Sequence, residues 1–128
     1  MTNKLNLLSF ITLISTLGMG YASTSLEIQN VDITAGTLDI YIINSEPLGG
    51  FQFTLTGITI TSLTGGSADN ADFTVSTANN TILGFSLSGT TVPAGQGVLT
   101  HISFSDYQGG AICFSDALDN IGGSINVI

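Results

Sequence analysis

Basic side chains are almost absent from the sequence. Its single lysine or arginine is Lys4, whereas all nine aspartates and glutamates lie at Glu27 or later. Nucleic-acid affinity depends on lysines and arginines that neutralise phosphates, and attraction to an anionic membrane surface depends on the same residues. The sequence therefore excludes nucleic acid and anionic lipid as partners. The positively charged partners that remain are a cation from the medium or a basic protein surface. The simpler role of the acidic residues is to keep the protein soluble.

The sequence has a single cysteine and no tryptophan. The one cysteine, Cys113, cannot form an intramolecular disulfide. It lies in a strand-like segment at residues 111–115, where we expect a small buried hydrophobe, and an intermolecular disulfide or a reactive thiol is the alternative. There is no Trp, and Tyr41 and Tyr107 are the only tyrosines after residue 22. Few aromatic side chains are therefore available to stack on a polysaccharide, and any glycan binding would have to use loop residues.

The residues that catalysis or zinc binding would need are not assembled by the sequence. His101 is the only histidine, and a zinc site needs three or four ligands, of which Cys113 is the only other soft one. We expect His101 to be an exposed or hydrogen-bonded strand residue. No Gly-x-Ser-x-Gly elbow occurs, and no spacing pairs two carboxylates as a glycosidase requires. The sequence therefore predicts no enzyme and no catalytic residue.

The first 22 residues have the pattern of a secretory signal peptide. Lys4 precedes an apolar run from Leu5 to Leu17, and the small residues Gly20 and Ala22 fit a cleavage site after Ala22. The run is shorter than the ~20 apolar residues of a spanning helix. We therefore expect residues 1–22 to be removed. Residues 23–128 then form one secreted domain, extracellular or at the cell surface, with no membrane association.

Short alternating segments are what the sequence has in abundance. At residues 49–57, Phe51, Phe53 and Leu55 alternate with polar residues between flanking glycines, which indicates a strand with one buried face. About eight or nine such segments recur, with turn signals every ~8–12 residues. The expected strands lie at residues 23–33, 37–43, 51–56, 58–63, 73–77, 81–88, 98–104, 111–115 and 124–128. The sequence predicts an all-β, antiparallel β-sandwich.

The buried faces follow from the same alternation. In residues 81–88, Leu83, Phe85 and Leu87 point one way. The expected core consists of the large side chains that would meet between two sheets, which are Phe51, Phe53, Leu55, Phe73, Phe85, Ile102 and Phe104. In residues 98–104, Val98 is expected on the same face as Ile102, and Leu99 on the opposite face.

The order of the segments resembles a known family. Residues 50–55 read Gly-Phe-Gln-Phe-Thr-Leu, residues 60–65 read Ile-Thr-Ser-Leu-Thr-Gly, and residues 97–104 read Gly-Val-Leu-Thr-His-Ile-Ser-Phe. This pattern is similar to that of the cohesin domain and of related carbohydrate-binding modules, over roughly residues 26–128. The resemblance implies a jelly-roll sandwich that binds a protein partner outside the cell, usually a dockerin. The family's Tyr-Asp-Pro segment is replaced here by residues 56–59. The resemblance assigns no dockerin-contact residue to this sequence.

Two pairs of aspartates fall in segments expected to be loops. Asp69 and Asp72 form one pair, and Asp116 and Asp119 form the other. Calcium takes oxygen ligands, so these four residues are candidate calcium ligands, although neither pair has the spacing of an EF-hand. The alternative is a solvated acidic loop at each place.

These observations favour a non-catalytic binding or scaffolding module that recognises a protein partner through a sheet face or edge. One alternative is a self-assembling subunit of an extracellular fibre or surface layer, because no lysine guards the strand edges. The other alternative is a calcium-dependent carbohydrate-binding module. Apart from calcium, no cofactor is expected.

Overall fold

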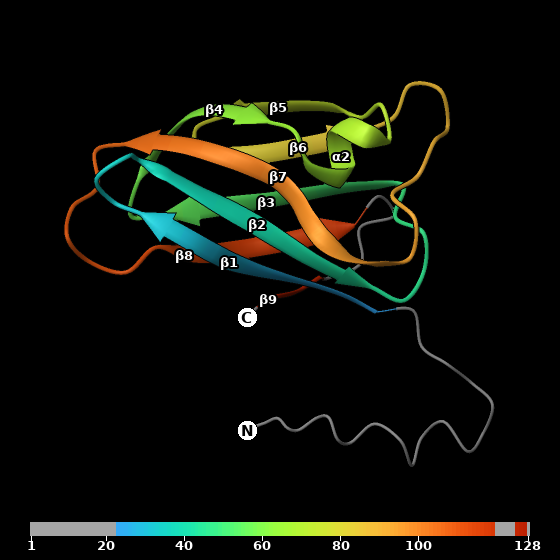
Figure 1. The fold of residues 1–128 in the computed structure, drawn as a ribbon, viewed down its shortest axis with the longest axis horizontal. Helices are drawn as coiled ribbons and strands as arrows, with labels where there is room; N and C mark the ends of the chain where they lie inside the picture. The colour runs from blue at the N-terminus through green and yellow to red at the C-terminus, as the bar shows by residue number, and fades with distance from the viewer. Residues whose placement is uncertain (1–22, 120–124, 128) are drawn as a thin grey trace, which may run out of the picture.

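Two β-sheets stack face to face to form a sandwich (Figure 1). The computed structural model describes residues 23–119 and 125–127. One sheet has the order β4-β7-β2-β1-β9, with β4 (Thr59–Thr64), β7 (Gly95–Ser105), β2 (Thr37–Asn44), β1 (Thr24–Asp32) and β9 (Asn126–Val127). The other has the order β5-β6-β3-β8, with β5 (Thr74–Ala78), β6 (Thr81–Phe85), β3 (Gly50–Thr56) and β8 (Cys113–Asp119). All neighbours are antiparallel except β1 and β9. The predicted β-sandwich is confirmed.

The core lies between β2 and β3, where the alternation is strongest. Phe51, Phe53 and Leu55 of β3 are each at most 1% exposed. The ring of Phe51 stacks on those of Phe53 and Phe73, with centroids 5.9 and 6.0 Å apart. The alternating residues of β2, which are Leu38, Ile40 and Ile42, are buried as well. Each buried side chain of this size stabilises the fold by about 1.5–3 kcal/mol relative to exposure, so this layer holds the two sheets together.

The alternation in β6 was predicted correctly, but the side assigned to it was wrong. Ile82 and Gly84 face the core, whereas Leu83 is 42% exposed and Phe85 is half-buried. A Cβ at Gly84 would lie only 2.3 Å from Cζ of Phe51. The bare glycine therefore makes room for the Phe51 ring, and this packing turns Leu83 and Phe85 outward. Leu87 lies beyond the end of the strand and is 83% exposed.

A bulge in β7 exchanges two neighbouring side chains between faces. Ile40 of β2 pairs with Thr100 and the next residue, Tyr41, pairs with Val98, so Leu99 has no partner in the register. Leu99 is fully buried and Val98 is half-buried. The predicted faces of Val98 and Leu99 were therefore wrong. Strict alternation cannot anticipate the extra residue of a bulge.

A five-residue helix, α2 (Gly66–Asn70), replaces part of the loop expected after β4. Ala68 is its buried residue, and a Cβ at Gly66 would lie 2.3 Å from the backbone oxygen of Leu99. The helix therefore lies directly on β7. One turn of helix is too short to show a helical period in the sequence. In the described part of the chain no helix is long and apolar enough to cross a membrane, and the expected signal peptide lies outside it.

The turn predicted between β5 and β6 is confirmed and also connects the two sheets. Asn79 and Asn80 both have positive φ, 52° and 64°, as a two-residue hairpin turn requires. The Asn80 side chain donates to the carbonyl of Ile58 over 2.5 Å and accepts from the amide of Ile60 over 3.0 Å. Because Ile60 belongs to β4, this one side chain links the hairpin of the four-stranded sheet to the five-stranded sheet.

Candidate functional site

An apolar surface lies on the outside of the four-stranded sheet. Leu83 of β6, Gln52 of β3 and Leu118 of β8 form one row, because Gln52 is the register partner of both leucines. Phe85 follows Leu83 on the same side of β6. A hollow of about 310 Å³ is lined by these four side chains, among others. We call this surface the β6–β3–β8 face.

Hydroxyl groups surround the apolar row. Thr54 and Thr81 lie opposite each other on β3 and β6, and their Oγ1 atoms are 2.8 Å apart in a hydrogen bond. On the edge strand, Ser76 is the register partner of Leu83. Asp116 of β8 is the register partner of Thr54 and is exposed. An apolar centre with a polar rim is the usual anatomy of a protein–protein interface.

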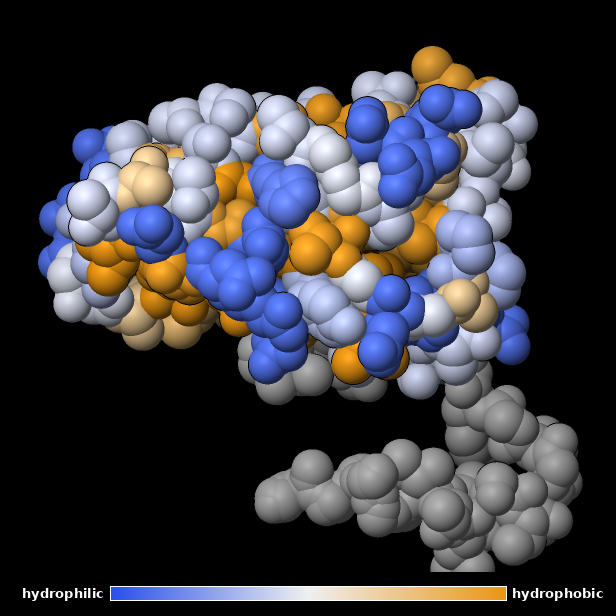
Figure 2. Space-filling model, in the orientation of Figure 1, coloured by the Kyte–Doolittle hydropathy of each residue, from blue (hydrophilic) through white to orange (hydrophobic). Residues whose placement is uncertain are grey.

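The outer surface of the other sheet is occupied by its own polar contacts. Asp39 of β2 and His101 of β7 are register partners, and Oδ1 of Asp39 lies 2.5 Å from Nδ1 of His101. Asn30 donates to the other carboxylate oxygen over 2.9 Å. Figure 2 shows a band of hydrophilic side chains across this surface with hydrophobic areas on either side of it, and we call the surface the β7–β2–β1 face. The expectation of a hydrogen-bonded strand residue at His101 agrees with this geometry.

Electrostatics reinforce the Asp39 contact. Partial burial would by itself raise the pKa of Asp39, because it disfavours the charged form. The hydrogen bonds from Asn30 and His101 and the charge of His101 act in the opposite direction and together hold the pKa below its ordinary value of 3.8. Asp39 therefore stays ionised at neutral pH.

Cys113 is exposed, contrary to the expectation of a buried hydrophobe. The register of β8 explains the difference. Phe114 pairs with Leu55 and packs edge-on against Phe53, with ring centroids 5.6 Å apart. Phe114 thus takes the inward position, and Cys113, opposite Thr56, is left on the outer side of the strand.

The four candidate calcium ligands lie in two separate parts of the fold. Asp69 belongs to α2 and Asp72 follows it, whereas Asp116 and Asp119 lie on β8, the far edge strand of the four-stranded sheet. The prediction of a loop around Asp116 and Asp119 was wrong, because the pairing of β8 with β3 continues as far as Asp119. Within the described residues, no group of three or more His, Cys, Asp or Glu side chains is gathered for a metal. Calcium binding stays a prediction, and the melting temperature with and without millimolar calcium would test it.

The sequence pattern did not identify the β6–β3–β8 face as a surface. It assigned Phe85 to the core because the residue is large and apolar, and the alternation then placed Leu83 on the same side. The signal that could have found them is Gly84. A glycine between two large apolar residues, in a strand predicted to pack near a phenylalanine-rich strand, indicates a close approach of another side chain at the glycine.

Comparison with known proteins gives a structural similarity. No family model matches the sequence, and no curated protein is similar enough to match it. Among solved structures, the fold is similar to that of a cohesin, CaCohA2, in the crystal structure of its complex with a variant of CaDoc0917 at pH 5.5. The TM-score is 0.51 at 14% sequence identity, over 82% of this chain and 93% of that chain. At this identity the likeness concerns the fold, and the chain is a β-sandwich of the cohesin-like kind.

Proposed function

We propose that this chain is a non-catalytic, extracellular binding module that recognises a dockerin-like protein through the β6–β3–β8 face. The observation that carries the proposal is the exposure of Leu83 beside the half-buried Phe85 and Leu118 on the outer surface of one sheet. The similarity of the fold to a cohesin crystallised with a variant of CaDoc0917 supports the class of partner.

The chemistry of the β6–β3–β8 face suits a protein partner. Burying an aliphatic or aromatic side chain against a partner gains about 25 cal/mol for each Å² of apolar surface removed from water. The surrounding hydroxyls of Thr54, Thr81 and Ser76 can donate and accept hydrogen bonds without a charge that must be desolvated. The side chains project from paired strands, so little conformational entropy is lost on docking.

The opposite surface is less suited to recognition. Its central charges, on Asp39 and His101, already contact each other. A partner on the β7–β2–β1 face would have to compete with that contact and with the hydrogen bond from Asn30. Ile43 on β2 is 44% exposed and is therefore a matched reference for Leu83, which is 42% exposed.

Isothermal titration of purified dockerins, CaDoc0917 among them, against three forms of the protein tests the proposal. For the dockerin that binds, we expect Leu83→Gln to lower the affinity by about 10- to 100-fold, as loss of an interface hot spot does. Ile43→Gln should leave the affinity within about twofold. If Ile43→Gln weakens binding and Leu83→Gln does not, the assigned face is wrong.

Sedimentation velocity over a range of protein concentrations separates the fibre alternative. A monodisperse monomer supports a module with a distinct partner. Concentration-dependent assembly in the absence of any dockerin, abolished by Leu83→Gln, would assign the same face to self-association and would contradict the dockerin-like partner.

A further inference from the structure

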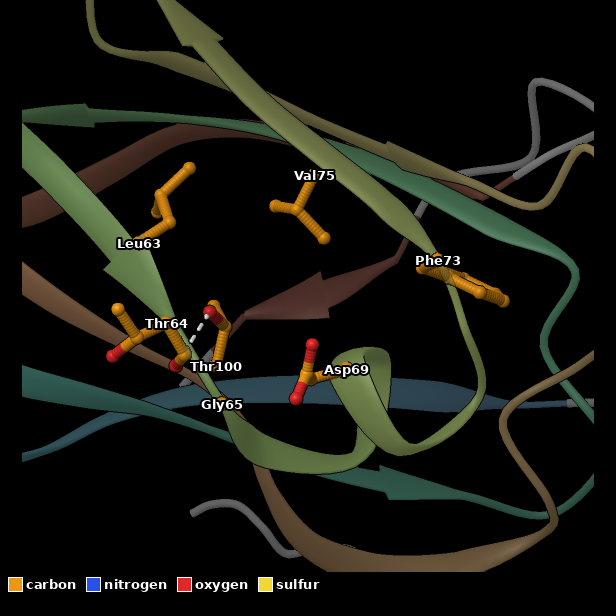
Figure 3. A pocket seen from close by; sticks show the side chains of 7 residues that line it. All are labelled: Leu63, Thr64, Gly65, Asp69, Phe73, Val75 and Thr100. Carbon is orange, nitrogen blue, oxygen red and sulfur yellow. Dashed lines mark hydrogen bonds between the residues drawn. The ribbon is translucent and has the colours of Figure 1, made fainter.

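A second recessed surface lies between the two sheets at the edge where β4 and β5 face each other. It is a cleft of about 140 Å³. Leu63 of β4 and Val75 of β5 form its apolar walls, and Phe73 closes one side. Figure 3 shows Leu63 and Val75 reaching into the space from the two edge strands. We call it the edge cleft.

The polar groups of the edge cleft lie together at its other end. Asp69 of α2, Thr64 at the end of β4 and Thr100 of β7 line that end. In Figure 3 the Asp69 carboxylate extends from α2 toward the Thr100 side of the space. The carboxylate and the Thr64 carbonyl can only accept hydrogen bonds, and the Thr100 hydroxyl, which donates to that carbonyl over a long 3.4 Å, has lone pairs free to accept.

In the part of the chain that the structure describes, no cationic side chain pairs with the Asp69 carboxylate. After Lys4 the sequence contains no lysine or arginine. His101 is the only histidine. Its ring lies close to Gly65, which lines the edge cleft, since a Cβ at Gly65 would be 3.1 Å from Cδ2 of His101, but its ion pair is with Asp39 on the β7–β2–β1 face. Across residues 23–119 and 125–127, Asp69 takes part in no ion pair. Among the described residues, the exposed Asp69 carboxylate at the end of this apolar cleft therefore has no cationic partner.

We propose that the edge cleft receives a lysine side chain from a protein partner. Its four-carbon stem would lie against Leu63 and Val75, and its ammonium group would meet Asp69. A cleft of about 140 Å³, with apolar walls and hydrogen-bond acceptors at one end, matches a side chain that has a flexible apolar stem and an ammonium head. Lysine fits better than arginine, because acceptors from three separate residues match three rotatable donors, whereas a planar guanidinium prefers a bidentate fork.

The partner would present this lysine from an extended segment. Among the described strands, β4 pairs with β7 alone and β5 pairs with β6 alone, so both strands beside the edge cleft have an open edge. A segment lying along such an edge directs alternate side chains toward the sandwich interior. The proposal does not depend on docking at the β6–β3–β8 face.

Titration with a short peptide, followed by methyl and amide NMR shifts, tests the edge cleft. The probe is a capped tripeptide with a central lysine, and the same peptide with central norleucine is the uncharged reference. We expect saturable shifts at Leu63, Val75 and the α2 amides with the lysine peptide. Asp69→Asn should weaken this binding about fivefold, and the norleucine peptide should bind unmodified protein about fivefold more weakly.

Asp72→Asn is the matched control, because Asp72 is close in sequence but does not line the edge cleft. Its affinity should stay within about twofold of the unmodified protein. Equal losses in both variants, or equal binding of the norleucine peptide, would overturn the proposal. Saturable binding of n-butylammonium without binding of the lysine peptide would also overturn it, since the cleft would then take free amines. Leu83→Gln should leave these shifts unchanged, so failure here is distinguishable from failure of the dockerin proposal.

Discussion

The two outer faces of this sandwich differ in which side chains they expose and in how those side chains are paired. On the β7–β2–β1 face, Asp39 contacts both His101 and Asn30 across neighbouring strands. On the β6–β3–β8 face, Leu83 and Leu118 flank the polar Gln52, and the charged residues Asp116 and Asp119 lie beside this row on β8. A surface whose strong polar groups are already paired offers a partner little, whereas an exposed apolar row gains stability when it is covered.

The cause of the difference lies inside the sandwich. Gly84 leaves space for the Phe51 ring, and this sets the register in which β6 presents Leu83 and Phe85 to the outside. In β2 the inward positions are filled by Leu38, Ile40 and Ile42, so the outward positions carry Asp39 and Tyr41. A glycine in one strand therefore changes what the opposite side of that strand displays.

The largest expected effect comes from breaking the link between the two sheets. Asn80→Ala removes both hydrogen bonds to the segment at Ile58 and Ile60 and leaves part-buried backbone groups unpaired. Together with the strain of alanine at positive φ, this should lower the free energy of unfolding by about 3 kcal/mol. Asn79→Ala is the control, because it has the same kind of backbone strain without those bonds, and should cost about 1 kcal/mol. Equal losses in urea unfolding would show that Asn80 does not join the sheets.

The next effect tests how β6 acquires its outward face. Gly84→Ala places a methyl group against the Phe51 ring, which is already packed between Phe53 and Phe73. Overpacking of this kind should lower the free energy of unfolding by about 1–3 kcal/mol. Gly110→Ala, where an added Cβ meets nothing within 4 Å, should be neutral within about 0.5 kcal/mol. A neutral Gly84→Ala in thermal and urea unfolding would contradict the packing argument.

A smaller effect, dependent on pH, concerns the paired face. Because the pKa of Asp39 in the folded protein is below 3.8, the unfolded chain takes up its proton first as the pH falls. The stability contributed by Asp39 is therefore present above about pH 4 and is lost as the pH falls through its folded pKa. Asp39→Asn should lower the free energy of unfolding by about 0.5–1 kcal/mol at pH 6 and flatten its decline toward pH 3.

Asp116→Asn, on the opposite face, is the control for this measurement. Asp116 is exposed and takes part in no ion pair among the described residues, so Asp116→Asn should change the free energy of unfolding at pH 6 by less than about 0.5 kcal/mol. Equal losses at pH 6 in the two variants would show that Asp39 is not a distinct contributor.

The smallest effect separates the inside of β6 from its outside. Leu83→Thr replaces an exposed apolar side chain by another strand-forming residue and should change the free energy of unfolding by less than about 0.5 kcal/mol. Ile82→Thr, at a fully buried position next to it, should be strongly destabilising, because it buries a hydroxyl in place of an ethyl group. A large loss for Leu83→Thr would mean that Leu83 belongs to the core.

The sequence predicted the strands correctly where apolar and polar residues alternate without interruption. β2 and β3 were placed within about a residue at each end, since apolar residues occupy every second position there. The sides of Leu83 and Val98 were not predictable in the same way. The first depends on the close approach of Phe51 to Gly84, and the second on a bulge opposite β2. Both are contacts between distant segments.

The candidate site shows the same limit. Asp116 and Asp119 have low strand propensity and were assigned to a loop, but hydrogen-bonded pairing with β3 overrides that preference. The edge cleft combines Leu63, Asp69 and Val75 from three different elements. No local pattern indicates that these elements meet.

Cross-saturation NMR of the protein bound to the dockerin-like partner that we propose tests most directly which face is used. Saturation transferred from the partner should reduce the methyl signals of Leu83 and Leu118, and should leave those of Ile43 and Val98 at full intensity. The reverse pattern, with Ile43 and Val98 saturated and both leucines unaffected, would contradict the assignment of recognition to the β6–β3–β8 face.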